Sequence, residues 1–154
     1  MKKNNLLGHF AVNENKIAIL YSTYANQFPK YADFWNRLVK DEKRHALLLT
    51  DINDRFGAES DTWKVSKNAP VILDYIGRFL DDCLLQAQSS KLSFKEAISN
   101  ALSLEQSMIE KNNFDIFSTD NAEVNAVLEK LNRETDFHRS CLEKYFDTGV
   151  WLND

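Results

Sequence analysis

The sequence contains few of the residues that turns, short strands and disulfide frameworks need. Its 154 residues include only four Gly, two Pro and two Cys. So few turn-forming residues favour long helices over many short strands joined by tight turns. Cys83 and Cys141 do not stand in a CxxC spacing, which excludes a zinc ribbon and a thioredoxin-like motif. We expect both to be reduced, half-buried packing residues.

A long apolar run and an excess of positive charge are also missing. No stretch reaches the roughly 18 apolar residues of a membrane span, and the basic segment 1–8 lacks the apolar run of a signal peptide. A formal net charge of −4 excludes a generally basic surface for DNA or RNA. The sequence therefore predicts a soluble, cytoplasmic, single-domain protein over residues 1–154 that binds neither nucleic acid nor membrane.

Apolar residues recur at three- and four-residue spacing along nearly the whole chain, the pattern of amphipathic helices. This spacing predicts helices over residues 12–28, 31–56, 70–88 and 93–117, and a last one that begins near Thr119 or Asn121 and ends at 146. It also predicts a polar loop over residues 58–67 and no strand. Pro29 breaks the first helix from the second, and Gly57 is expected to end the second. Ser93 and Glu96 form a capping-box pattern. The inward stripe expected for the third helix is Val71, Ile72, Tyr75, Ile76, Phe79 and Cys83.

The long connection between the second and fourth helices predicts the topology. It spans about 35 residues, and the helix within it, at about 1.5 Å per residue, is long enough to run back along a bundle. We therefore expect an all-α four-helix bundle with a long helical crossover, in which the helices over residues 31–56 and 93–117 run parallel. The alternative is a fifth helix packed on the side of a simple up-and-down bundle.

Five ionisable residues interrupt the apolar stripes, with at least one on each of four helices. They are Glu14, Glu42, His45, Glu105 and His138. Burying unpaired carboxylates costs several kcal/mol, and neighbouring carboxylates also repel one another. A cation among them removes both penalties, and carboxylates with imidazoles suit iron, manganese or zinc. Taken singly, each residue has an ordinary alternative, such as a histidine bonded to a carbonyl or a glutamate near a helix start.

These residues, in this order, resemble the rubrerythrin-like branch of the ferritin-like superfamily. The similarity is greatest over residues 14–46, where Tyr21 follows Glu14 by seven residues and Glu42-x-x-His45 stands in the next helix. The resemblance implies a ferritin-like fold around a di-iron centre, with manganese or zinc as alternatives, and Tyr21 as a catalytic residue close to the metals. The metal ligands that it implies are Glu14, Glu42, His45, Glu105, Glu134 and His138.

The second half of the chain departs from the family pattern. Three residues before His138 the family has a glutamate, whereas this chain has Thr135, and Glu134 stands four residues before the histidine. On a helical wheel Glu134 and Thr135 lie equally far from the centre of the stripe, on opposite sides, so Glu134 is a candidate ligand. Met108 stands three residues after Glu105, where the family has another glutamate. A reduced di-metal centre, a single-metal site and a site that has lost its metal all remain open.

The resemblance implies a di-iron oxidoreductase of peroxidase or ferroxidase type, which reacts with peroxide or oxygen or oxidises Fe(II). Rubrerythrin itself carries a second iron site with two CxxC motifs, and their absence here implies an external electron donor. One alternative is a scaffold with a reduced or lost metal site that binds a partner or dimerises through exposed aromatic residues. The residues expected for that role are Trp63, Tyr145, Phe146 and Trp151. A second is an oxygenase acting on an organic substrate. We expect a homodimer.

Overall fold

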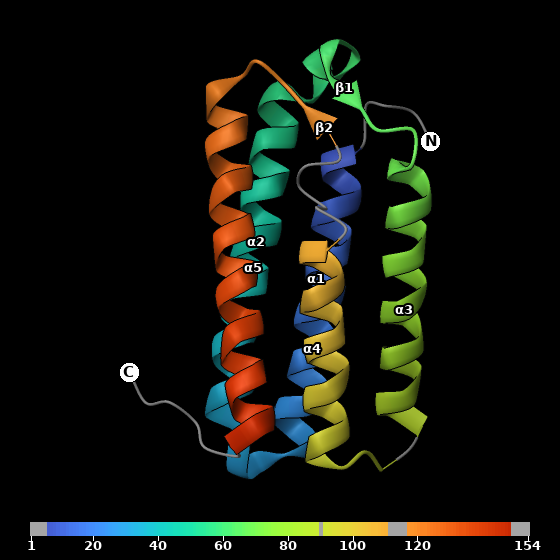
Figure 1. Cartoon of the computed structure of the whole chain (residues 1–154), viewed down its shortest axis with the longest axis vertical. Helices are drawn as coiled ribbons and strands as arrows, with labels where there is room; N and C mark the ends of the chain where they lie inside the picture. Colours follow the sequence, from blue (N-terminus) through green and yellow to red (C-terminus); the bar gives the residue numbers. More distant parts are fainter. Residues whose placement is uncertain (1–5, 90, 111–116, 149–154) are drawn as a thin grey trace.

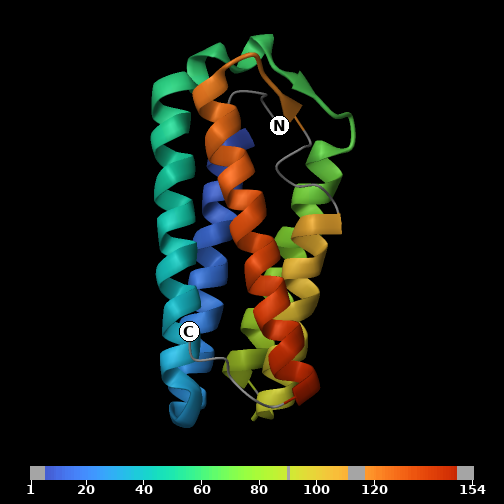
Figure 2. The same cartoon turned by 60° about the vertical axis from the view of Figure 1, so that its left-hand side comes forward.

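Over the residues that the structure describes, the chain is all-helical apart from two very short strands. The structure is a computed structural model, and it describes residues 6–89, 91–110 and 117–148. Five α-helices occupy most of these residues (Figures 1 and 2). They are α1 (Leu6–Gln27), α2 (Ala32–Phe56), α3 (Ala69–Ser89), α4 (Phe94–Glu110) and α5 (Ala122–Thr148). The all-α class predicted from the sequence is confirmed.

The helices form two closely packed pairs, α1 with α2 and α4 with α5. Following the chain in Figure 1, α2 and α4 run in the same direction, whereas α1, α3 and α5 run in the opposite one. The long connection therefore returns the chain to the end at which α2 began, as its length predicted. Helix α3 occupies this connection and packs against α1 and α4. Helix α5 begins beside the end of α2 and leans toward α4 farther along (Figure 2).

Local chemistry accounts for most helix boundaries. Pro29 begins a 3-10 turn, Pro29–Tyr31, that separates α1 from α2. At the start of α4 the Glu96 amide donates to the Ser93 hydroxyl at 3.2 Å, and the Ser93 amide donates to the Glu96 carboxylate at 2.7 Å. This reciprocal pair is the predicted capping box. At the start of α5 the Asn121 side chain accepts from two backbone amides of the first turn, so this predicted start is also confirmed.

The helix α2 ends at Phe56, directly before Gly57 as predicted, although the φ of Gly57 is −60° and the chain continues into a 3-10 helix, Gly57–Thr62. Two other predictions for this part of the chain need correction. The segment predicted as a polar loop then forms strand β1 (Lys64–Val65), which pairs antiparallel with β2 (Phe117–Ser118). Residue 117 was predicted to end a helix, so that prediction was wrong. Strands of two residues are too short to show a period.

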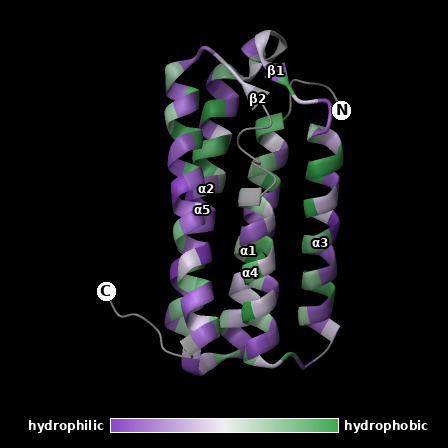
Figure 3. Ribbon diagram, viewed as in Figure 1, coloured by the Kyte–Doolittle hydropathy of each residue, from purple (hydrophilic) through white to green (hydrophobic). Residues whose placement is uncertain are grey.

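The core is built from the apolar sides of all five helices, and hydrophobic and hydrophilic residues alternate along each ribbon in Figure 3. The stripe predicted for α3 was partly wrong, because Val71 and Tyr75 are 70% and 53% exposed. Helix α3 packs mainly against α1 and α4, so a narrower face is buried. Its buried residues are Ala69, Leu73, Ile76, Leu80, Cys83 and Ala87. Cys83 is thus a buried packing residue, while Cys141 is half-buried.

Two of the four aromatic residues proposed for a partner-binding surface are not available to a partner. Trp63 and Tyr145 are buried in the core, and Phe146 is 40% exposed. Trp151 lies outside the described residues. The scaffold hypothesis therefore loses two of the four aromatic residues proposed for its surface. Among the described residues, no helix is both long enough and apolar enough to cross a membrane.

Candidate metal centre

The five polar residues predicted to face inward are all buried. Their exposed fractions are 2% or less, although each carries an ionisable side chain. They come from α1 (Glu14), α2 (Glu42, His45), α4 (Glu105) and α5 (His138). Helical spacing explains why Glu42 and His45 are both buried on α2, because residues three apart lie on one face of a helix. The side chains gather in two groups that share Glu42, and within each group the potential ligand atoms lie within 4.8 Å of one another.

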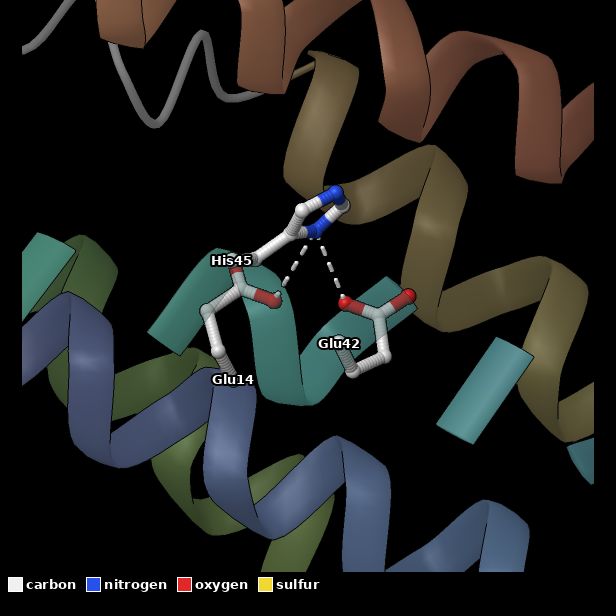
Figure 4. Close-up of side chains that lie close together, drawn as sticks. All are labelled: Glu14, Glu42 and His45. Carbon is white, nitrogen blue, oxygen red and sulfur yellow. Dashed lines mark hydrogen bonds and ion pairs between the residues drawn. The ribbon is translucent and has the colours of Figure 1, made fainter. Parts of the chain in front are cut away.

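The first group joins α1 to α2. The Nδ1 atom of His45 lies 3.1 Å from Oε2 of Glu42 and 3.8 Å from Oε2 of Glu14. Figure 4 shows both carboxylates directed at this one ring nitrogen. Two carboxylates and one imidazole thus converge on one point inside the protein, where water does not compensate their charge.

The second group joins α2 to α4 and α5. The Nδ1 atom of His138 lies 2.8 Å from Oε1 of Glu42 and 3.8 Å from Oε1 of Glu105. The rings of His138 and His45 are nearly parallel, with their centroids 5.6 Å apart. One carboxylate oxygen of Glu42 thus faces each histidine. Glu42 is therefore the residue that the two groups share, and it could contact a cation held by either group.

Three buried atoms of these groups have no hydrogen-bond partner among the described residues. They are Oε1 of Glu14, Oε1 of Glu42 and Nδ1 of His138. The last two are only 2.8 Å apart, yet they are not aligned for a hydrogen bond. Donors bound at 2.0–2.2 Å to one metal and at right angles to each other lie about 3 Å apart. The spacing and the unpartnered atoms could accommodate a shared cation, and a hydrogen bond between Nδ1 of His45 and Oε2 of Glu42 also holds the first group together.

A second layer of carboxylates holds the far side of each histidine ring. The Nε2 atom of His45 lies 2.7 Å from Oε2 of Glu134 on α5, and the Nε2 atom of His138 lies 3.3 Å from Oδ2 of Asp41 on α2. Arg44 bonds to both carboxylates, at 2.9 Å to Glu134 and 2.8 Å to Asp41. An Nε2–H that donates to a carboxylate leaves the Nδ1 lone pair for a metal and fixes the plane of the ring.

The charges in the two groups shift one another's pKa values. Burial, and then the charge of Glu42, raises the pKa of Glu14 well above its usual range and raises that of Glu105. Burial opposes the charged form of Glu42 too, but the neighbouring histidines outweigh it and lower the pKa. Burial by itself lowers the pKa of His45, yet Glu14 and Glu42 raise it to about 10. The pKa of His138 is raised well above 6.5 by Glu42, Asp41 and Glu105, against burial. With a pKa of about 10, the His45 imidazole is protonated at neutral pH in the metal-free protein.

Tyr21 lies beside the second group, as the sequence predicted. It is fully buried, and its hydroxyl donates to Oε1 of Glu105 at 2.7 Å. Burial first, and then the Glu105 carboxylate, raises the pKa of this phenol well above 10. The ring lies against Trp35, with the centroids 5.4 Å apart. Tyr21 therefore stays protonated and holds one oxygen of Glu105 in place.

Glu134 does not lie where a direct ligand would. Its side chain is 29% exposed, and it bonds to Nε2 of His45, whereas Glu14 and Glu42 face Nδ1. It therefore belongs to neither group. Sequence reasoning also missed the role of Asp41. The signal was available, since Asp41 stands four residues before His45 just as Glu134 stands four before His138.

Searches of protein-family models, of curated proteins and of solved structures found no match for this chain. The likeness to ferritin-like proteins thus stays a prediction from the sequence. Any function must be argued from the geometry of the two groups around Glu42.

Proposed function

We propose that the chain is a ferritin-like, rubrerythrin-like metalloprotein that binds two transition-metal ions, with iron as the physiological metal. In this proposal α1, α2, α4 and α5 form the four-helix bundle, and α3 is its crossover. The activity is that of an oxidoreductase that reacts with peroxide or oxygen, or oxidises Fe(II), with electrons from an external donor. The homodimer stays a prediction.

The observation that carries the proposal is the position of Glu42. Its two carboxylate oxygens face the Nδ1 atoms of His45 and His138, at 3.1 Å and 2.8 Å. The oxygen near His138 is buried and has no hydrogen-bond partner among the described residues. A carboxylate in a purely structural role is expected to be fully hydrogen-bonded when buried. Two cations, one for each group, would use both oxygens.

The donor types support iron over softer metals. The two groups together offer three carboxylates and two imidazoles, and neither includes a cysteine. Oxygen and imidazole donors suit iron, manganese and zinc, whereas copper(I) prefers sulfur. When bound, an iron pair would supply electrons to a small oxidant. Each group offers three protein ligands, which leaves coordination positions open for that oxidant.

The chain's own residues would hold and tune this centre. Glu14 and His45 would bind one ion, Glu105 and His138 the other, and Glu42 both. Tyr21 would orient Glu105 through its hydrogen bond and present a buried phenol close to the reacting atoms. Because the centre is buried, water is largely excluded, which strengthens the electrostatic contacts around it.

Metal titration of the wild type and of a Glu42→Gln variant tests the proposal. Gln keeps the size of the side chain but removes the charge that faces both histidines. We expect the metal-free wild type to bind two Co(II) or anaerobic Fe(II) ions per chain and to gain thermal stability, since a ligand that binds only the folded state stabilises it. Glu42→Gln should lose most of this affinity at both positions.

The matched control is Glu129→Gln, which changes a glutamate that is 73% exposed on the outer side of α5. It should titrate like the wild type. A wild type that binds neither ion, and whose melting temperature does not change with Fe(II), would contradict the proposal. If two ions bind, mixing the Fe(II)-loaded protein with hydrogen peroxide and following the absorbance of Fe(III) tests the redox activity.

A further inference from the structure

A groove of about 430 Å³ lies between α1 and α3. The two helices run in the same direction (Figure 1), and the residues that line the groove extend from His9 to Lys16 on α1 and from Pro70 to Asp81 on α3. At about 1.5 Å per residue, the α1 wall is about 10 Å long. None of the lining residues belongs to the two groups around Glu42, so the groove is a separate candidate site.

Asn13 is a buried polar residue that lines this groove, with an exposed fraction of 7%. Its carboxamide offers two N–H donors and one acceptor oxygen. Among the residues that the structure describes, none forms a hydrogen bond with this side chain. Buried polar side chains normally have such partners, so the carboxamide is available to a molecule in the groove.

Gly77 keeps the space beside this carboxamide open. It stands inside α3, where a glycine makes a helix less stable than an alanine would. Packing does not require a glycine here, because an added Cβ would meet only Oδ1 of Asn13, at an ordinary contact distance of 3.9 Å. The same distance shows that the Asn13 carboxamide is directed toward α3 and the groove.

The groove also carries two cationic and two anionic side chains. Lys16 on α1 pairs with Asp81 on α3 at 2.6 Å, and Arg78 pairs with Asp74 within α3. Asp81 and Arg78 are well exposed, with 61% and 77% of their side chains accessible. Ion pairs exposed to water contribute little to stability, so a ligand with charges of both signs can exchange with them at small loss.

We propose that this groove binds a short peptide with free amino and carboxyl ends. The Asn13 carboxamide donates to a peptide carbonyl and accepts from a peptide N–H. The peptide carboxylate pairs with Lys16 or Arg78, and its ammonium group with Asp74 or Asp81. An extended chain rises about 3.3 Å per residue, so about three residues match the length of the groove.

Titrating the purified full chain with triglycine, followed by NMR chemical shifts, tests the proposal. We expect saturable binding to the wild type. Asn13→Ala removes the carboxamide and should weaken binding about 10-fold, the effect of about one lost hydrogen bond. Gly77→Leu fills the space beside the carboxamide and should abolish binding. The matched control is Gln88→Leu, which places a leucine at an exposed position of α3 outside the groove and should bind like the wild type.

A capped peptide tests the role of the charged side chains. N-acetyl-triglycine amide keeps the peptide groups but removes both charged ends, so it should bind about 10-fold more weakly or less. Equal binding of the capped peptide, or unchanged binding in Asn13→Ala, would overturn the proposal. No saturable binding to the wild type would also overturn it, with water as the partner of Asn13.

Circular dichroism checks that each variant is folded. If Gly77→Leu does not fold, Gly77→Ala replaces it, because a methyl group beside the carboxamide should already weaken binding while making α3 more stable. These measurements need no metal. They therefore test the groove independently of the proposed metal centre, and failure of either proposal leaves the other in place.

Discussion

At the scale of single residues, the centre depends on which nitrogen each histidine offers to a metal. Glu134 accepts from Nε2 of His45, and Asp41 accepts from Nε2 of His138. This arrangement leaves both Nδ1 atoms directed at Glu42. Arg44 links the two outer carboxylates, so one side chain at the α2–α5 contact stabilises the orientation of both rings.

Removing an outer carboxylate should therefore weaken metal binding without removing a ligand. We expect Asp41→Ala and Glu134→Ala each to lower metal affinity by about 10- to 100-fold, the usual effect of losing a histidine's outer partner. Asp41→Ala should mainly affect the ion held by His138, and Glu134→Ala the ion held by His45. Isothermal titration with Co(II) measures both affinities.

The control is Glu129→Ala, a glutamate of α5 whose side chain is 73% exposed. Its affinities should equal those of the wild type. Unchanged affinities in Asp41→Ala and Glu134→Ala would show that the outer carboxylates do not orient the rings.

At the scale of helices and strands, the candidate ligands lie at the same level along the bundle because each helix begins and ends at a defined residue. The start of α5 fixes the position of His138 along the bundle. There the Asn121 side chain accepts from the amides of Glu123 and Val124, at 3.0 Å and 3.1 Å. These bonds satisfy amides that have no partner within the helix.

Asn121→Ala should destabilise the protein but leave the metal ligands intact. We expect a loss of about 1 kcal/mol in the free energy of unfolding, the usual value for a lost N-terminal cap. Urea denaturation of the metal-free protein measures it. Asn121→Asp keeps an acceptor oxygen and should remain near the wild type. A variant Asn121→Ala as stable as the wild type would mean that the cap contributes nothing.

Local signals in the sequence predicted the helices, their caps and the inward glutamates and histidines. The Ser93 cap and the Glu42-x-x-His45 spacing depend only on neighbours within one helical turn, so they can be read directly. The β1–β2 pair and the exposed position of Tyr75 could not be predicted, because they depend on which distant elements α3 and the connections contact. The contact of Glu134 with His45 likewise joins residues far apart in sequence.

At the scale of the whole molecule, the buried centre makes stability depend on pH. The folded-state pKa of His45 is about 10, against 6.5 for the free side chain. A raised pKa contributes stability that is fully present below pH 6.5 and is lost as the pH rises toward 10. The pKa values of His138, Glu14 and Glu105 are raised too, so their contributions have the same sign.

We therefore expect the melting temperature of the metal-free protein to fall between pH 6.5 and pH 10. Bound Co(II) should reduce this fall, because the metal takes the place of the protons on the histidines. Thermal unfolding followed by circular dichroism, at several pH values and with and without Co(II), measures both effects. In the metal-free protein, His45→Gln should reduce the fall of the melting temperature with rising pH. A metal-free melting temperature that rises across this interval would contradict the raised pKa of His45 on which the prediction depends.

The sharing of Glu42 between the two groups also has a consequence for the order of assembly. The first group lies wholly within residues 14–45, on two helices that are consecutive in the chain, whereas the second needs residues 105 and 138 as well. Contacts between nearby segments form faster, because less chain entropy is lost in closing the loop. If the proposed metal centre exists, a nascent α1–α2 hairpin would be able to capture one ion before the remainder of the protein folds. That ion would fix Glu42 as a template on which α4 and α5 then complete the second position.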